Sequence, residues 1–183
     1  EVKVIKTAYD STQARADEEV KGIKYTIEQT GSTITLKYEI PKSMNFSNNV
    51  NTVDFVVTVP SETTVAVDTN MGEVSVADTK GNVDIKNDFG DVTLENIEGA
   101  LTVKTNSGDV NATSIVAGTE NIDLSSDFGG VTLKKAGGKD IALDSNSGVI
   151  TLSEVRATGD LNANTDFGNT KFENGSADSL HIE

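Results

Sequence analysis

Short stretches of alternating apolar and polar residues recur over the C-terminal two thirds of the chain. Each repeat carries two apolar-class positions before a glycine, as in Val83 and Ile85, and two after it, as in Val92 and Leu94. Because strand side chains alternate between faces, each pair lies on one face of a short strand. The repeat glycines are spaced by 18 to 21 residues: Gly72, Gly90, Gly108, Gly129, Gly148 and Gly168.

The two connections in each repeat differ in how much their lengths vary. Across the glycine, the gap between inward residues is always 7 residues, whereas the other connection spans 7 to 10. One fixed turn and one variable side are typical of a β-solenoid, whose coils pair about 4.8 Å apart. We therefore predict an all-β chain in which residues 63–183 form a parallel β-solenoid of about six coils of about 20 residues. A flattened 39-residue coil, with Gly72 beside Gly108, is the alternative geometry.

Residues 1–62 lack the repeat and are predicted to form a separate region of irregular strands. The predicted strands are 2–6, 23–29, 32–40 and 53–60, and residues 10–20 are predicted as a loop or a single helical turn. Exposed solenoid ends favour pairing with other strands, so we expect this region to cap the first coil.

The tripeptide Asp-Phe-Gly, which is the magnesium-binding signature of protein kinases, occurs three times at intervals of 39 residues. Such a recurrence indicates a structural repeat rather than a catalytic aspartate. Amide and carboxylate alternate two residues before the glycines, so we expect each amide to donate to a neighbouring carboxylate. This column is Asn70, Asp88, Asn106, Asp127, Asn146 and Asp166. The next column is Met71, Phe89, Ser107, Phe128, Ser147 and Phe167, and we expect each ring to cover part of the adjacent coil.

A cation bridging Asp88, Asp127 and Asp166 is the alternative interpretation of the carboxylate column. No spacing in the chain matches an EF-hand or the calcium-binding nonapeptide of β-helices. We expect these residues to form turns, and we expect neither a metal nor a cofactor.

The charge of the chain narrows the choice of partners. A net charge of −14 disfavours nucleic acids and anionic lipid surfaces. No stretch approaches the roughly 20 apolar residues of a membrane span. The chain begins with Glu1 rather than methionine and has no cysteine. We expect a leader that has been removed and an extracytoplasmic location.

Other candidates for chemistry are few. The outward residues Asp84, Asp123, Lys86 and Lys104 could suggest the acidic and basic groups of a β-helical polysaccharide lyase, but we interpret them as residues of solvated strand faces. His181 is the single histidine, which argues against histidine-based catalysis. The chain has no tryptophan, and Tyr9, Tyr25 and Tyr38 all precede the repeats, so a flat sugar-binding face is not expected on the solenoid.

The segment "VVTVPSETTVAVDTNMGEVSV" at 56–76, followed by repeated Gly-x-Val-x-hydrophobic units, resembles a bacterial family of adhesin-type β-strand-repeat domains of unknown function. The resemblance covers most of the chain. It implies a β-solenoid fold and attachment to the cell envelope or secretion, and it carries no catalytic residues.

These observations favour a non-enzymatic secreted or envelope scaffold for adhesion or interaction. Its partner would be a protein or glycan of the envelope or cell surface, and an exposed edge strand would also permit a homo-oligomer. The alternative is a polysaccharide-active β-helix enzyme or a carbohydrate-binding module. At least three converging carboxylate or basic side chains in a groove would favour the enzyme.

Overall fold

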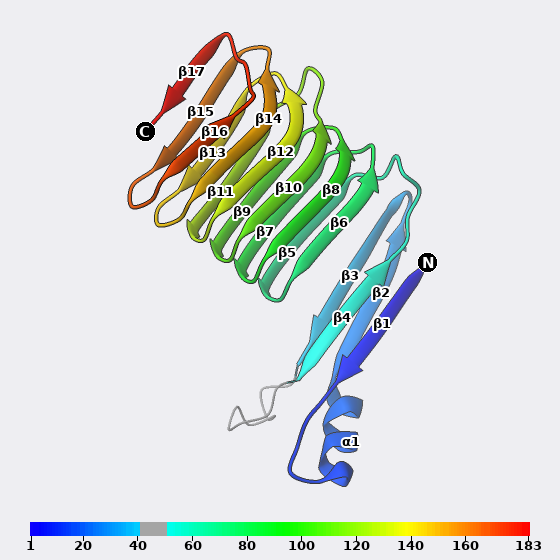
Figure 1. Ribbon diagram of the computed structural model, residues 1–183. Helices are drawn as coiled ribbons and strands as arrows, with labels where there is room; N and C mark the ends of the chain where they lie inside the picture. Colours follow the sequence, from blue (N-terminus) through cyan, green and yellow to red (C-terminus); the bar gives the residue numbers. More distant parts are fainter. Residues whose placement is uncertain (41–50) are drawn as a thin grey trace. The chain divides into compact units, whose positions relative to one another are not determined.

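The computed structural model describes residues 1–40 and 51–183 (Figure 1). By its internal contacts the chain divides into two compact units, Glu1–Val59 and Pro60–Glu183. The division lies close to the predicted change from irregular strands to repeats at residues 62 and 63.

The N-terminal unit contains two antiparallel strand pairs. β1 (Val2–Thr7) pairs with β4 (Thr52–Val57), and β2 (Lys24–Thr30) pairs with β3 (Thr33–Glu39). Gly31, with φ of +62°, lies in the turn between β2 and β3. All four strands predicted for this region are confirmed, with ends that shift by at most three residues.

The segment predicted as a loop or one helical turn is a longer helix, α1 (Gln13–Gly22). Thr12 caps it, because its side-chain oxygen accepts a hydrogen bond from the backbone N–H of Arg15. Alanine, arginine and glutamate in the segment are good helix formers, which together with the cap explains the extra length. Ile23, directly after the helix, is buried.

The C-terminal unit is a stack of coils, each contributing one strand to each of two parallel sheets (Figure 1). One sheet has the order β17-β15-β13-β11-β9-β7-β5 and the other β16-β14-β12-β10-β8-β6. The strands are β5 (Val65–Met71), β6 (Val74–Thr79), β7 (Val83–Phe89), β8 (Val92–Glu98), β9 (Leu101–Ser107), β10 (Val110–Val116), β11 (Ile122–Phe128), β12 (Val131–Gly138), β13 (Ile141–Ser145), β14 (Ile150–Ala157), β15 (Asp160–Thr165), β16 (Thr170–Glu173) and β17 (Ser179–Ile182).

Strand register confirms a coil of about 20 residues. Val65 of β5 lies opposite Val83 of β7, and Ile122 of β11 lies opposite Ile141 of β13. The 39-residue alternative is wrong, because the residues that pair are one repeat apart and not two. The prediction of a parallel β-solenoid of about six coils is therefore confirmed.

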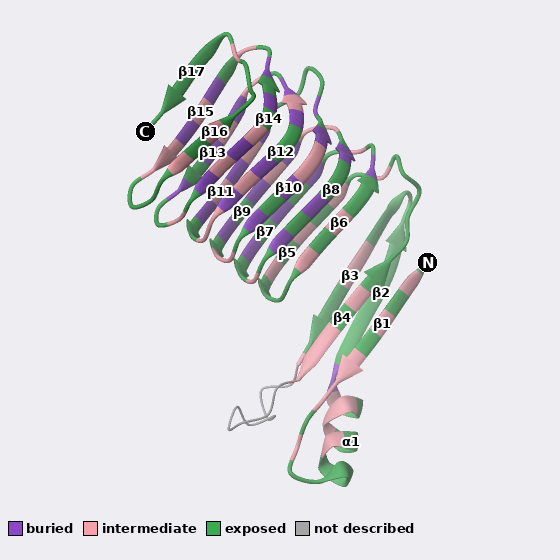
Figure 2. Ribbon diagram, in the orientation of Figure 1, coloured by how far each residue is buried: buried purple, intermediate pink, exposed green. Residues whose placement is uncertain are grey.

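The core lies between the two sheets and is built largely from the predicted inward pairs. Leu124 and Leu143 are completely buried, as are Val131 and Leu152 on the opposite sheet. Figure 2 shows buried bands alternating with exposed ones along β7 to β15. Aliphatic side chains fill a space of about 10 Å between two packed sheets, which explains why the repeats contain so few aromatic residues.

The side predicted as a variable loop contains one more inward position per coil. It follows a residue with left-handed backbone, such as Asn96 with φ of +55°, after which Ile97 points into the core and is fully buried. The equivalent left-handed residues are Asp78, Ser114, Lys135, Glu154 and Asn174. Asparagine and aspartate tolerate this conformation better than most residues. The sheet containing β8 thus bends without ending, and the variable connection is shorter than predicted.

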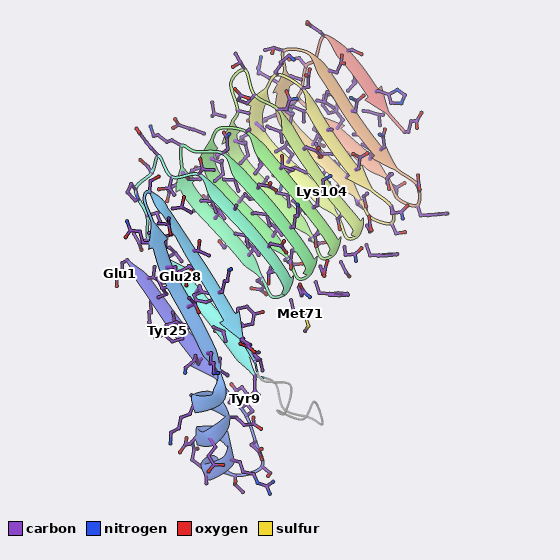
Figure 3. The ribbon with its side chains drawn as sticks, turned by 180° about the vertical axis from the view of Figure 1, so that it is seen from behind. Glu1, Tyr9, Tyr25, Glu28, Met71 and Lys104 are labelled. Atoms are coloured by element: carbon purple, nitrogen blue, oxygen red, sulfur yellow. The ribbon has the colours of Figure 1, made fainter. Side chains whose placement is uncertain are left out.

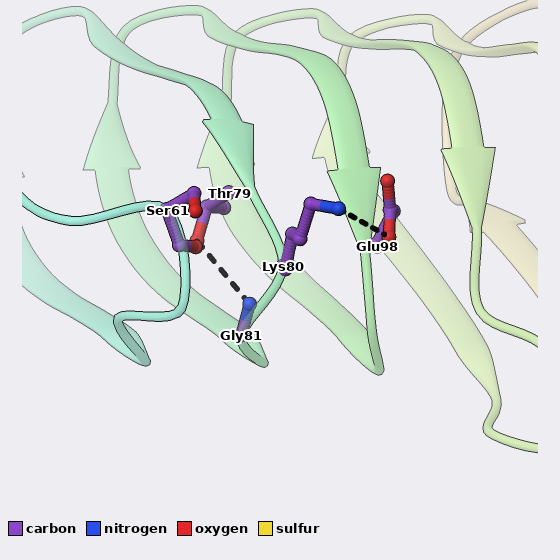
Figure 4. A network of polar contacts seen from close by, with 5 residues as sticks. All are labelled: Ser61, Thr79, Lys80, Gly81 and Glu98. Carbon is purple, nitrogen blue, oxygen red and sulfur yellow. Dashed lines mark hydrogen bonds and ion pairs between the residues drawn. The ribbon is translucent and has the colours of Figure 1, made fainter.

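Polar contacts fix the start of the first coil (Figure 4). Thr79 is buried, and its hydroxyl lies 3.1 Å from the carbonyl oxygen of Ser61 and 3.3 Å from the backbone N–H of Gly81, which donates to it. Lys80 reaches the next coil, where its Nζ lies 3.5 Å from Oε2 of Glu98. These contacts hold Ser61 against the end of β6 and join the first coil to the second. That residues 1–62 cap the first coil stays a prediction.

Among residues 1–40 and 51–183, no helix is both long and apolar enough to cross a membrane.

Candidate functional site

The six repeat glycines stack at one corner of the solenoid, which we call the glycine corner. A Cβ atom built on Gly90, Gly108 or Gly148 would lie closer than 3.0 Å to the backbone of the glycine one coil earlier. Gly129 and Gly168 meet the same obstacle. Glycine is therefore required here because successive backbones approach too closely for any side chain.

Buried polar side chains close the core just inside the glycine corner. Asn87 Nδ2 donates to the carbonyl oxygens of Gly72 and Gly90, at 3.0 and 2.9 Å. Ser126 Oγ donates to the Gly108 carbonyl at 2.8 Å. Ser145 and Thr165 make the same bond to Gly129 and Gly148. These bonds satisfy turn carbonyls that the core would otherwise leave without partners.

These side chains belong to a polar column three residues before each glycine, which a search for apolar alternation does not reveal. Its members are Thr69, Asn87, Thr105, Ser126, Ser145 and Thr165. The signal was present, because period two continues from the inward apolar pair to this position and every member is a small polar residue. Two members depart from the bonding pattern. Thr69 Oγ1 donates to the carbonyl oxygen of Met71 at 3.4 Å, and Thr105 Oγ1 has no hydrogen-bond partner among the described residues.

The Asn and Asp side chains two residues before the glycines are exposed, Asp88, Asp127 and Asp166 among them. In the described ranges no hydrogen bond joins one of these side chains to the next, so the predicted amide-carboxylate ladder is wrong in this column. Carboxylates do link coils one residue after the glycine. Oδ1 of Asp91 accepts from the Asp109 N–H, and Oδ1 of Asp109 accepts from the Gly130 N–H, both at 2.8 Å.

Apolar side chains project from the glycine corner into solvent. Exposure is 73% for Met71, 55% for Phe89, 62% for Phe128 and 79% for Phe167. We call these four residues the ridge, and Figure 3 shows Met71 projecting from its turn. The expectation that each ring covers the adjacent coil is wrong. The polar column containing Asn87 closes the core two residues earlier, so the rings lie outside that closure.

Strand register arranges the ridge in a row along the coil stack. Met71 lies opposite Phe89, Phe89 opposite Ser107, and Ser107 opposite Phe128. Backbone hydrogen bonds continue the same column through Ser147 to Phe167. The three rings therefore recur on every second coil, with serine between them. The row rests on closely stacked glycine backbone, so its spacing is fixed by the fold.

Asp127 also provides a test of the cation interpretation. Asp88, Asp127 and Asp166 lie on alternate coils, about 10 Å apart along the stack. Among the described residues no three acidic or histidine side chains gather closely enough to hold an ion. We expect Asp127→Asn to keep the fold, and millimolar calcium to leave the melting temperature of the wild type unchanged. A calcium-dependent rise of several degrees that the variant lacks would contradict this, because a ligand that binds only the folded state stabilises it.

The lyase-like residues lie on the outward face of one sheet. Thr102 separates Asp84 from Asp123 in one column, and Lys86 lies opposite Lys104 in the next. A shallow hollow of about 250 Å³ on this face is lined by Thr102, Asn121, Ile122, Asp123, Asp140, Ile141, Ala142 and Asn162. It contains two carboxylates and no basic side chain. The hollow therefore has fewer than the three converging charged groups that would favour an enzyme.

Asp140, at the edge of this hollow, serves as a link between coils. Its Oδ1 accepts a hydrogen bond from the Asp160 N–H at 3.2 Å, and its Oδ2 lies 3.2 Å from Nζ of Lys139. The backbone hydrogen bond first, and then Lys139, hold the pKa of this carboxyl below its ordinary value of 3.8. Asp140 is thus ionised at neutral pH, and its carboxylate bonds to the backbone of the next coil.

The remaining candidates lie apart from one another. His181 is exposed on β17, with its Nε2 3.0 Å from Oε1 of Glu183. Tyr9, Tyr25 and Tyr38 belong to the N-terminal unit. In the part of the chain that the structure describes, no three His, Cys, Asp or Glu side chains gather closely enough to hold a metal ion.

Comparison with protein families agrees with the coil stack. The Toastrack DUF4097 model matches residues 1–182, and the Toastrack fold is a β-solenoid. Neither curated proteins nor solved structures give a match. Since the family match extends over nearly the whole chain, the protein belongs to the Toastrack DUF4097 family, whose domains are β-solenoids of unknown function.

Proposed function

We propose that the protein is a non-enzymatic interaction module of the bacterial envelope or cell surface, which binds an extended partner along the ridge. The observation that carries the proposal is the row of four exposed apolar side chains, Met71, Phe89, Phe128 and Phe167. Exposed apolar groups that are aligned by the fold are typical of binding surfaces, whereas isolated ones need no explanation.

The setting of the ridge suits recognition of a long, straight ligand. Its rings project from backbone that the coil stack holds in place, so that backbone need not be ordered when a partner binds, and such preorganisation favours affinity. The flanking column supplies exposed amides and carboxylates such as Asn106 and Asp127. A partner would therefore meet an apolar row bordered by hydrogen-bonding groups, which is the usual composition of an interface.

The charge and the family resemblance support the proposed location and partner class. A net charge of −14 disfavours nucleic acid and anionic lipid, leaving neutral or basic partners. Envelope attachment or secretion is typical of the adhesin-type family that the repeats resemble. We therefore expect the partner to be a component of the envelope or cell surface.

The test uses a ridge variant in which Phe89, Phe128 and Phe167 are all replaced by serine. Serine already occupies this column at Ser107 and Ser147, so the fold should tolerate it. The full chain is sedimented with isolated envelopes of the producing bacterium. We expect the wild type to bind and the ridge variant to bind at least about tenfold more weakly, equivalent to about 1.4 kcal/mol.

Val116→Ser is the matched control, because Val116 is 60% exposed but lies outside the ridge at the end of β10. It should bind as the wild type does, and circular dichroism should show that both variants are folded. Equal binding by the wild type and the ridge variant, or no binding by the wild type, would refute the proposed function.

A further inference from the structure

The spacing of the rings along the ridge indicates the kind of ligand that the ridge fits. Phe89, Phe128 and Phe167 lie on alternate coils, with Ser107 and Ser147 on the coils between them. Adjacent strands lie about 4.8 Å apart, so neighbouring rings are separated by about 10 Å. A ligand that contacts all three rings equally must therefore repeat at about that distance.

Several polymer repeats can be compared with this spacing. Side chains on one face of an extended peptide recur about every 6.8 Å and do not match the rings. An α-helix rises about 5.4 Å per turn, so its turns do not match the rings one for one, and only alternate turns, about 10.8 Å apart, come close. A β-1,4-linked pyranose chain does match. Alternate sugars in it are turned over, so the same sugar face recurs once per disaccharide, a repeat of comparable length to the ring spacing. The C–H-rich face of a pyranose packs well on an aromatic ring, and the serines leave room for the intervening sugars.

A polyproline II chain also has a suitable repeat, about 9.3 Å for three residues. The polar groups beside the rings favour the sugar. Three of the six flanking residues are aspartates, Asp88, Asp127 and Asp166, and an ionised carboxylate only accepts hydrogen bonds. Sugar hydroxyls donate to such acceptors, whereas a run of prolines has no backbone N–H to donate.

The same carboxylates limit the charge of a sugar that could bind. Asp88, Asp127 and Asp166 are exposed beside the rings, and Asp91 and Asp109 follow the adjacent glycines. A polyanionic glycan would be repelled by this border and by the net charge of −14. Amides such as Asn106 and Asn146 both donate to and accept from neutral hydroxyl or acetamido groups.

We propose that the ridge binds a neutral β-1,4-linked polysaccharide, with Phe89, Phe128 and Phe167 stacking on every second sugar and the flanking Asn and Asp side chains bonding to its polar groups. The inference rests on the proposed function and names the ligand class for the same surface. The absence of tryptophan, which argued against a sugar-binding face, is offset by phenylalanines that are exposed rather than folded onto the coils.

Calorimetric titration of the full chain with soluble oligosaccharides tests the proposal. Cellohexaose and chitohexaose each present three like-facing sugars and distinguish a glucose from an N-acetylglucosamine polymer. Maltohexaose is the control for linkage, because its α-1,4 chain coils and does not repeat at the ring spacing. We expect binding of at least one β-linked hexaose, no binding of maltohexaose, at least tenfold weaker binding by the ridge variant, and unchanged binding by Val116→Ser.

The outcomes separate the ligand class from the proposed function. If envelopes bind through the ridge but neither β-linked hexaose binds, the polysaccharide inference is refuted and the interaction module stands. Ridge-dependent binding of decaproline in place of both hexaoses would overturn the inference in favour of a proline-rich partner. Hexaose binding that the ridge variant retains would refute the ridge as the site.

Discussion

Gly148→Ala is expected to destabilise the solenoid by at least about 3 kcal/mol, the upper end of the usual cost of overpacking. The new Cβ would collide with the carbonyl oxygen of Gly129 and lie 2.8 Å from Oγ of Ser145. The obstacle is largely backbone, and the hydrogen bond from Ser147 N–H to the Asp127 carbonyl keeps the coils together. Relief would require two coils to separate. Urea unfolding followed by circular dichroism measures the loss.

Gly137→Ala is the matched control in the same solenoid. Its Cβ would meet nothing closer than the carbonyl oxygen of Arg156, at 3.9 Å, which is ordinary van der Waals contact. Its backbone does not require the left-handed region. We expect a change within about 1 kcal/mol, close to the centre of the distribution for single substitutions. The explanation by close approach fails if the two substitutions cost the same.

Leu143→Ala is expected to cost about 2 to 5 kcal/mol, the range for truncating a buried leucine. Leu143 is fully buried, and its column neighbours are Leu124 on one coil and Ala163 on the next. β13 is hydrogen-bonded to a parallel strand on each side, so its backbone cannot easily move to fill the cavity that truncation leaves. Lys104→Ala, on the exposed face of β9, is the control and should change the free energy of unfolding by less than about 0.5 kcal/mol. A loss below about 1 kcal/mol for Leu143→Ala would contradict the assignment of inward and outward faces.

The coil length and the inward pairs were predictable because they depend on local alternation. Val83 and Ile85 alternate with outward Asp84 and Lys86, and the same pattern returns one coil later. The constant gap across the glycine then identifies which residues stack. Neither step requires knowledge of side-chain contacts.

The bend on the other side was not predicted, because it interrupts the alternation. Glu95 and Asn96 are both outward, and only the left-handed backbone of Asn96 returns Ile97 to the core. The alternation of inward and outward residues ends at Leu94, so the sequence pattern predicts a loop for the residues after it. The backbone conformation of one residue decides this feature, and the residues that adopt it range from Asn and Asp to Lys and Glu.

The side-chain contacts predicted at the glycine corner were wrong for a different reason. Inward positions were identified by apolar character, so Asn87 and Ser126 were not recognised as buried, although they bond to the turn carbonyls. Once these residues close the core, the rings after them have no apolar surface to cover. At this corner Asp91 and Asp109 make the inter-coil carboxylate bonds, because their short side chains reach the backbone N–H of the next coil.

Six phenylalanines in the chain allow a direct test of the ridge as the binding surface. In a protein with ¹³C-labelled phenylalanine rings, NMR signals would be followed while cellohexaose or chitohexaose is added. We predict that the signals of Phe89, Phe128 and Phe167 shift together. Phe55 in the N-terminal unit and the partly buried Phe172 should not respond. Shifts confined to Phe55 or Phe172, or no shift of the three ridge signals with either hexaose, would contradict the account.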